Sequence, residues 1–246
     1  YLIHVKGMDF VPAVQLLCEK LTPVLPEQPR PVEAPAPTLF ALPEKNDNSF
    51  IVTAYLMRRG IDFNVIARCM ENGTLYESKG HHNAVFVGMD EAGVPRYAML
   101  RGTDGGSFKV EAAGSDKRFA FSMRGTSDTL LVAESAIDAL SVATILRGSG
   151  KEWRVPHYLS LGGISEKQTT VPRALEQYLS EHPDILHIRL MLDNDRAGRG
   201  AAQRIIELLG DRYEVRGIFP AHGKDYNDEA RWQAANSVVK RDDKEK

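Results

Sequence analysis

The sequence has few cysteines and no excess of charge of either sign. Its 246 residues include only Cys18 and Cys69, and the formal net charge is −2. Two cysteines so far apart exclude a disulfide framework and are typical of buried thiols in a reducing compartment. A nearly neutral chain is not a globally basic nucleic-acid-binding protein, so any surface for nucleic acid must be local.

The sequence also lacks a long hydrophobic run. No segment approaches the ~18 consecutive apolar residues of a membrane helix, and no signal peptide is evident. With 43% hydrophobic and 26% charged residues, the composition is that of an ordinary globular protein. These features predict a cytoplasmic protein with no membrane partner. The chain begins at Tyr1 inside an apolar pattern, from which we expect further sequence upstream.

Proline is concentrated in one segment. Six prolines fall within residues 22–37, a density that excludes helix and sheet and predicts an extended linker. Residues 1–21 before it have the pattern of a short helix pair or a bent helix, which is too small to build a core alone.

Residues 38–126 contain helix patterns followed by strand patterns. The turn Asp90–Gly93 separates two β-rich runs and predicts a hairpin. Helices followed by an antiparallel sheet predict a small α+β domain. We expect helices at residues 50–59 and 62–70, and strands at 74–77, 84–89, 96–101, 108–110 and 119–121.

Residues 127–230 instead alternate strand and helix patterns. Apolar strands separated by helices predict a parallel sheet with helices on both faces, and ligands of such sheets bind beyond the carboxyl ends of the strands. Residues 231–246 end in a charged run and are expected to form a frayed, solvated tail. We expect strands at residues 129–133, 157–161, 185–192 and 213–218. We expect helices at 135–147 and 196–209, and a mostly helical segment at 166–180 whose first part is broken by Pro172.

Acidic residues follow the predicted strands. Asp193 and Asp195 come after one strand, Glu134 comes directly after another, and Asp138 lies one turn into the next helix. If these two strands are neighbours, the carboxylates converge at one edge of the sheet. A polar cluster at residues 223–228 follows the last strand and would close the same site.

Converging carboxylates repel one another, so they coexist with a counter-cation or in a partly protonated state. Oxygen ligands without nearby histidine or cysteine favour Mg²⁺ or Mn²⁺ over Zn²⁺. An aspartate between a strand and a helix is also a common N-cap, and Asp195 has that position. From spacing alone, a metal site and simple helix capping both remain open.

The order of these motifs resembles the Toprim domain, and most closely the catalytic core of DnaG-type bacterial primases. The segments that carry the resemblance are Val132–Leu140, Leu159–Gly163 and Leu192–Arg199, and it covers about residues 127–230. Upstream, Tyr55–Ile61, the hairpin ending at Arg101-Gly102 and Gly114–Phe119 resemble the amino-terminal half of a primase core. Val5–Val14 resembles the end of a primase zinc-binding domain.

The resemblance implies an α/β Toprim domain, with a parallel sheet and helices on both faces, preceded by a smaller α+β domain. Zn²⁺ ligands would lie upstream of Tyr1, because Cys18 and Cys69 do not match them. The implied organisation is a zinc-domain remnant at residues 1–21, a linker at 22–37, a primase-core-like domain at 38–126, the Toprim domain at 127–230 and a tail at 231–246.

The resemblance also implies roles for the acidic residues. Asn227 stands where the family has the second acid of an Asp-x-Asp pair, so a second or third metal would be held more weakly, and Asp228 is the residue that would compensate. The implied catalytic residues are Glu134, Asp193 and Asp195. The implied ligands of Mg²⁺ or Mn²⁺ are Glu134, Asp138, Asp193, Asp195, Asp225 and Asn227.

Cationic side chains are the candidates for binding nucleotide and nucleic acid. Arg101 and Lys117 stand at positions that resemble the primase basic motifs near the incoming nucleotide, whereas Lys79, Lys109 and Arg124 have no such support. For each cation the alternative is a solvated surface charge. The residues predicted to bind nucleotide or nucleic acid are Arg101, Lys117, Arg118, Arg59, Arg196 and Lys224.

These features predict a Mg²⁺-dependent, primase-like nucleotidyltransferase. Its partners would be a single-stranded DNA template, nucleoside triphosphates and a replicative helicase, and it would serve a mobile or accessory element. A Toprim-type DNA nuclease or strand-processing enzyme would use the same acids. A non-catalytic nucleic-acid-binding module is the third possibility, and the departure at Asn227 is its support.

Overall fold

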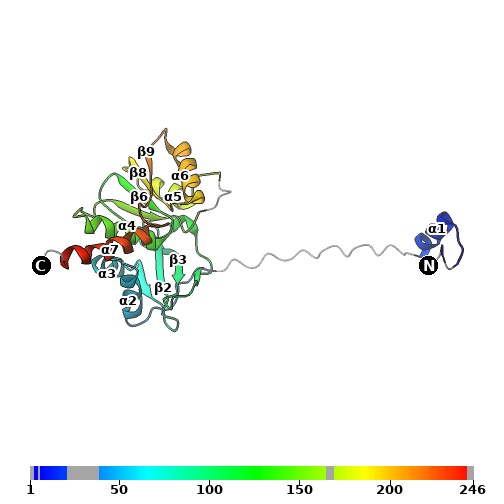
Figure 1. The fold of residues 1–246 in the computed structure, drawn as a ribbon, viewed down its shortest axis with the longest axis horizontal. Coiled ribbons are helices and arrows are strands. Elements are labelled where there is room, and N and C mark those ends of the chain that lie inside the picture. The colour runs from blue at the N-terminus through cyan, green and yellow to red at the C-terminus, as the bar shows by residue number, and fades with distance from the viewer. Residues whose placement is uncertain (1–2, 5, 21–38, 165–168, 243–246) are drawn as a thin grey trace. The chain divides into compact units, whose positions relative to one another are not determined.

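The computed structural model describes residues 3–4, 6–20, 39–164 and 169–242 (Figure 1). The chain divides into two compact units, Tyr1–Pro37 and Thr38–Lys246. The described part of the first unit contains one helix, α1 (Phe10–Lys20), whose first turn includes Pro12, where a missing N–H has no cost. The predicted linker at residues 22–37 lies outside the described residues, so it stays a prediction.

The second unit begins with two helices and an antiparallel sheet, as the sequence predicts. Helices α2 (Phe50–Arg58) and α3 (Phe63–Glu71) precede a sheet in the order β1-β2-β3-β4. The hairpin turn is closed by a hydrogen bond from Gly93 N to Asp90 O at 2.9 Å. The strands are β1 (Leu75–Glu77), β2 (Ala84–Met89), β3 (Pro95–Arg101) and β4 (Lys109–Glu111).

A buried carboxylate fixes helix α2 to this sheet. Glu77 is fully buried, and its Oε2 accepts from the backbone N–H groups of Ile51 and Val52 at 3.0 Å each. These groups lie in the first turn of α2 and have no partner within the helix. Because the hydrogen bonds favour the ionised form, the pKa of Glu77 is lowered in spite of its burial. Glu77 therefore sets the position of the helix that leads to Arg59.

A second sheet follows, in the order β5-β7-β6-β8-β9. Strands β6, β7, β8 and β9 are mutually parallel, and β5 pairs antiparallel with β7 at the edge. The alternation along the sequence predicts this parallel core correctly. The strands are β5 (Ser122–Met123), β6 (Thr129–Ala133), β7 (His157–Ser160), β8 (His187–Met191) and β9 (Glu214–Ile218).

The predicted strand at residues 119–121 was wrong. Residues Lys117–Phe119 form a short 3-10 helix, η1, in which the Asp116 side chain accepts from Arg118 N. The strand begins later, at Ser122, and joins the second sheet rather than the first. Its partner β7 lies more than thirty residues further along the chain, so local pattern did not identify the pairing.

Helices cover both faces of the second sheet (Figure 1). Alternate residues of β6 contribute to two hydrophobic clusters: Leu131 to the one that includes α4, and Leu130 to the one that includes α5 and α6. The two-sided burial explains the continuous apolar run in this strand. The helices are α4 (Ala136–Gly148), α5 (Arg173–Glu181), α6 (Arg196–Leu209) and α7 (Tyr226–Asp242).

The expectation of a frayed tail after residue 230 was wrong for residues 231–242. Helix α7 extends through them and lies beside α4. Its first turns are anchored by Tyr226 and Ala230, which are four residues apart and both buried. The charged run at the end of the sequence concealed the helix that precedes it. Residues 243–246 lie outside the described part.

The predicted domains at residues 38–126 and 127–230 share one hydrophobic cluster. Leu56 and Ile66 from the first region and Leu131 and Leu140 from the second are members of it. The boundary between the two regions therefore stays a prediction about sequence organisation, within one compact unit. No helix in the described part of the chain has the length and apolar character needed to cross a membrane.

Candidate active site

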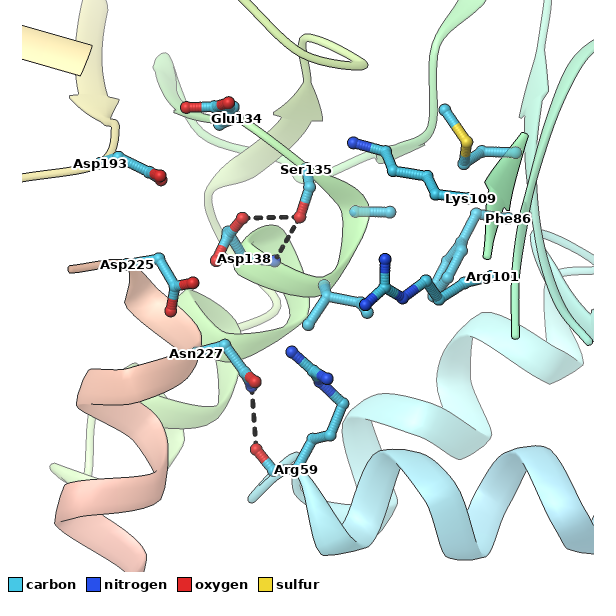
Figure 2. Close-up of a pocket in the computed structure, with 13 residues that line it drawn as sticks. Arg59, Phe86, Arg101, Lys109, Glu134, Ser135, Asp138, Asp193, Asp225 and Asn227 are labelled. Carbon is cyan, nitrogen blue, oxygen red and sulfur yellow. Dashed lines mark hydrogen bonds between the residues drawn. The ribbon is translucent and has the colours of Figure 1, made fainter. Parts of the chain in front are cut away.

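The carboxyl ends of β6 and β8 bring the predicted acids together. The two strands are adjacent and parallel, with Ala133 opposite Met191. Glu134 and Asp193 follow them and line one cavity of about 220 Å³, which we call the acidic cavity (Figure 2). Asp138 from α4 and Asp225 from the start of α7 line the same cavity. The convergence expected from the sequence is present in the structure.

The turn at residues 193–195 is held by its neighbours. Asn194 N donates to Lys224 O at 2.7 Å, and the Arg199 side chain donates to Asn194 Oδ1 at 2.9 and 2.6 Å. Asp195 Oδ1 accepts from Gly198 N at 2.8 Å and caps α6. Asp195 is not among the residues that line the acidic cavity, whereas Asp193 is.

Lys224 supplies a cation to this turn. Its Nζ lies 3.3 Å from Asp193 Oδ2 and 3.0 Å from Asp195 Oδ2. The two carboxylates raise the pKa of Lys224, and the hydrogen bonds from Gly198 and Lys224 lower the pKa of Asp195. Lys224 was predicted to bind nucleic acid. The structure shows it bridging two acids of the site, and its predicted role remains untested.

The deeper acids hold protons more tightly than usual. Burial, followed by the charges of Asp193 and Asp138, raises the pKa of Glu134 to about 7. Burial also raises the pKa of Asp138 to about 6, although Ser135 Oγ donates to its Oδ2 at 2.6 Å. The pKa of Asp193 is raised by burial against the opposing effect of Lys224. We call Glu134, Asp138, Asp193 and Asp225 the acidic wall. Burial makes its carboxyl groups harder to ionise, and a bound cation would favour their ionised forms.

The cluster at residues 223–228 closes the site as expected, with a different use of its side chains. Asp225 Oδ1 accepts from Asp228 N at 2.7 Å at the start of α7. Asp228 Oδ2 accepts from Lys224 N at 3.1 Å, so this carboxylate shapes the loop and does not line the acidic cavity. Asn227 lines the cavity, and its Nδ2 donates to Arg59 O at 2.9 Å and to Ser141 Oγ at 3.1 Å.

Three cations line the opposite side of the acidic cavity. Figure 2 shows Arg59, Arg101 and Lys109 across from the acids, and we call them the basic wall. The Tyr55 hydroxyl accepts from Arg59 Nη1 and Arg101 Nε at 3.4 Å each. Lys109 was a candidate cation in the sequence, but the family resemblance did not support it. Lys109 lies directly opposite Arg101 in the β3–β4 pairing. Knowledge of that strand register would have placed Lys109 beside Arg101 as a candidate for the same site.

Four of the six predicted nucleic-acid-binding residues, Lys224 among them, do not line the acidic cavity. Lys117 Nζ lies 2.9 Å from Glu111 Oε1 and lines a separate hollow that includes Gly162 and Arg173. Arg118 pairs with Asp116 at 2.7 Å, and Arg196 begins α6 outside the lining of the cavity. The predicted roles of Lys117, Arg118 and Arg196 are therefore not supported by proximity to the acids and remain predictions.

The acidic cavity offers the donors that suit a divalent cation. Its carboxylate oxygens are hard ligands, and Mg²⁺ needs only one or two protein carboxylates because it keeps several waters. Among the described residues, no three His, Cys, Asp or Glu side chains are gathered closely enough to form a ready-made metal cluster. The residues present therefore fit a partly hydrated Mg²⁺ better than a closed structural metal site.

Comparison with known families identifies two matching regions. Residues 131–230 match a family described as Toprim-like, and residues 54–127 match a family described as a protein of unknown function, DUF3991. A comparison with curated proteins finds no match. The acid-bearing part of this chain is a Toprim-like domain, as the motifs predict.

Solved structures extend the similarity over both regions. The primase fragment of the bacteriophage T7 primase-helicase protein matches with a TM-score of 0.56 at 18% identity, over 85% of this chain and 81% of that one. The Escherichia coli primase catalytic core gives 0.51 at 16% identity, and the DnaG primase catalytic domain bound to single-stranded DNA gives 0.51 at 15%. Each of these two matches covers 80% of this chain and 74% of the other. The chain has the fold of a primase catalytic core.

Proposed function

We propose that this protein is a Mg²⁺-dependent nucleotidyltransferase of the primase type, which uses nucleoside triphosphates on a single-stranded DNA template. The observation that carries the proposal is the acidic cavity, in which Glu134 and Asp193 face Arg59, Arg101 and Lys109. Carboxylates on one side suit Mg²⁺, and cations on the other suit a polyphosphate. A site with both halves fits a metal-bound triphosphate.

The acids and the cations of the cavity would have different roles in this reaction. Asp193, with Asp195, Asp138 and Asp225 near it, would hold Mg²⁺, and the metal when bound would neutralise charge on the reacting phosphate and the leaving pyrophosphate. Arg59 and Arg101 would donate paired N–H groups to phosphate oxygens, and Lys109 would add a single positive charge. Glu134, whose pKa is raised to about 7, is suited to accept and release a proton near neutral pH.

The proposal also includes a template, a protein partner and a cellular location. A structural neighbour is described as bound to single-stranded DNA, which supports such a template here. Another is the primase fragment of a primase-helicase protein, which supports a replicative helicase as partner. The predicted cytoplasmic location and role in a mobile or accessory element are part of the same proposal.

Primer synthesis on single-stranded DNA with labelled nucleoside triphosphates and Mg²⁺ tests the proposal. Wild-type protein should form template-dependent products. Asp193→Asn keeps the side-chain shape but removes the charge, and should lower the rate roughly 100-fold or more. Asp211→Asn is the matched control, because Asp211 is exposed in the turn after α6 and should change the rate less than about twofold.

Two outcomes would contradict the proposal. Nicking of supercoiled DNA with Mn²⁺, without any primer synthesis, would favour a Toprim-type nuclease that uses the same acids. DNA binding with no catalysis, unchanged by Asp193→Asn, would favour a non-catalytic binding module.

A further inference from the structure

The Asn227 side chain acts as a hydrogen-bond donor in this structure. It lies in the first turn of α7 and is only 2% exposed. Its Nδ2 donates to Arg59 O at 2.9 Å and to Ser141 Oγ at 3.1 Å, which uses both amide protons. An aspartate carboxylate has no proton to donate to the Arg59 carbonyl. An amide at residue 227 can therefore donate two hydrogen bonds that an ionised carboxylate could not donate.

The three partners of Asn227 come from different parts of the site. Arg59 O belongs to the C-terminal end of α2, where the last carbonyls lack partners within the helix. Ser141 lies on α4, one turn beyond Asp138, and the Asn227 backbone N–H bonds to the Asp138 carboxyl group. Asn227 thus connects the helix that ends at the basic wall with the helix that carries the acidic wall.

The junction between α2 and α7 is also tightly packed. Gly60, directly after Arg59, has φ +80°, and a Cβ there would lie 3.3 Å from the Arg231 backbone in α7. Glycine permits both the left-handed conformation and this close approach. The chain around Arg59 is consequently fixed to α7 at two successive residues.

The Arg59 side chain itself has weak anchors. Its Nη1 donates to Tyr55 Oη at 3.4 Å, and its Nε is buried without an acceptor in the described part of the chain. Buried N–H groups normally have a partner, and the acidic cavity leaves room for phosphate oxygens to provide one. The direction of the guanidinium therefore depends on where its backbone is held.

We propose that Asn227 is a positioning residue, which fixes the Arg59 backbone so that its guanidinium faces a triphosphate across from the acids, and that it is not a metal ligand. This rests on the proposed function for the identity of the ligand. It reverses the expectation that Asn227 is a weakened version of a metal-binding acid. It also means that restoring an aspartate at this position harms the site.

Calorimetric titration of the whole chain separates the two roles. Each ribonucleoside triphosphate is titrated into the protein in the presence of Mg²⁺. Asn227→Asp should weaken its binding roughly fivefold or more. The reason is that the Arg59 carbonyl loses its hydrogen-bond donor and faces a carboxylate. Mg²⁺ binding in the absence of nucleotide should stay within about twofold of wild type. Tighter Mg²⁺ binding with unchanged triphosphate binding would overturn the inference.

Matched variants exclude a purely structural effect. Asn236→Asp adds the same charge on an exposed face of α7, where Asn236 Nδ2 donates only to Trp232 O, and should leave triphosphate binding unchanged. In an Arg59→Ala background, Asn227→Asp should cause no further loss of triphosphate affinity. A further loss of the same size would mean that residue 227 affects triphosphate binding independently of Arg59, against the inference.

Two further measurements cover a variant that does not fold and a wild-type protein that binds no triphosphate. If Asn227→Asp fails to fold by circular dichroism, Asn227→Ala removes the donor without adding charge and carries the same expectations. If wild-type protein binds no triphosphate, the proposed function is overturned, and the Mg²⁺ titration still decides whether residue 227 is a metal ligand.

Discussion

Asp195 shows that a carboxylate that caps a helix can make a second interaction through its other oxygen. Its Oδ1 accepts from Gly198 N at 2.8 Å and caps α6, while its Oδ2 lies 3.0 Å from Lys224 Nζ. A carboxylate has enough lone pairs for both interactions. Capping through Oδ1 therefore leaves Oδ2 for the ion pair with Lys224, which spacing alone could not reveal, and the predicted metal-binding role of Asp195 stays a prediction.

Glu134 should make the stability of the metal-free protein depend on pH. Burial and neighbouring acids raise its pKa from 4.5 to about 7, so the folded state binds this proton more tightly than the unfolded state. The stabilisation is fully present below about pH 4.5 and is lost as the pH rises through about 7. Glu134→Gln should therefore raise the free energy of unfolding at pH 8 by roughly 1 to 2 kcal/mol, less than the full shift implies because the side chain is partly exposed.

Urea unfolding with EDTA, at pH values from 4.5 to 8, measures this effect. The control is Glu91→Gln, which changes an exposed side chain in the β2–β3 turn and should leave the pH profile parallel to wild type. A wild-type profile no steeper than that of Glu134→Gln would contradict the prediction.

At the scale of elements, the junction of β8 and α6 depends on one close approach. A Cβ at Gly198 would lie 2.2 Å from the carbonyl oxygen of Asp193, a distance that backbone atoms cannot tolerate. The glycine thus lets the start of α6 pack directly over the turn that carries both aspartates. The physical reason for this glycine in the motif is steric, since its φ is not in the left-handed region.

Gly198→Ala and Gly200→Ala form a matched pair within α6. Gly198→Ala should lower the free energy of unfolding by roughly 1 to 3 kcal/mol and displace the Asp193 turn, which would weaken Mg²⁺ binding. At Gly200 a Cβ would meet only the flexible end of the Arg204 side chain at 3.2 Å. Gly200→Ala should be neutral or stabilising by up to about 1 kcal/mol. Urea unfolding measures the stability of the two variants, and Mg²⁺ titration measures their metal affinity. Equal effects of the two substitutions would refute the steric explanation.

At the scale of the whole molecule, the two regions of the second unit should unfold together. Ile66 of α3 is fully buried in the hydrophobic cluster that also includes Trp153. Both tryptophans of the chain, Trp153 and Trp232, lie after residue 127, so the fluorophores themselves belong to the part of the chain that follows the first region. A mutation in the first region therefore tests whether the shared cluster makes unfolding cooperative.

Ile66→Ala should lower the free energy of unfolding by roughly 2 to 5 kcal/mol, through lost burial and a residual cavity. The tryptophan fluorescence and circular dichroism transitions should shift together. The control is Val110→Ala, where the side chain is 45% exposed and little should change. A fluorescence transition unmoved by Ile66→Ala would show two independently folding domains.

The sequence alone determined the parts of this protein that depend on local pattern. Strands such as residues 129–133 were predictable because a continuous apolar run and the helix-capping residue Ser135 lie within a few positions of each other. The placement of Glu134 and Asp193 at strand ends followed from the same pattern. The motif resemblance then predicted the Toprim fold, which the comparisons confirm.

Tertiary structure decided what faces the acids. Arg59, Arg101 and Lys109 come from a helix end and two paired strands, and only long-range packing places them on one wall while Lys117 lies elsewhere. It also decided the contacts of Asn227, whose partner Arg59 is 168 residues away in the sequence. Hydrogen bonds and packing between distant segments have no local period, so no reading of the sequence by itself could assign them.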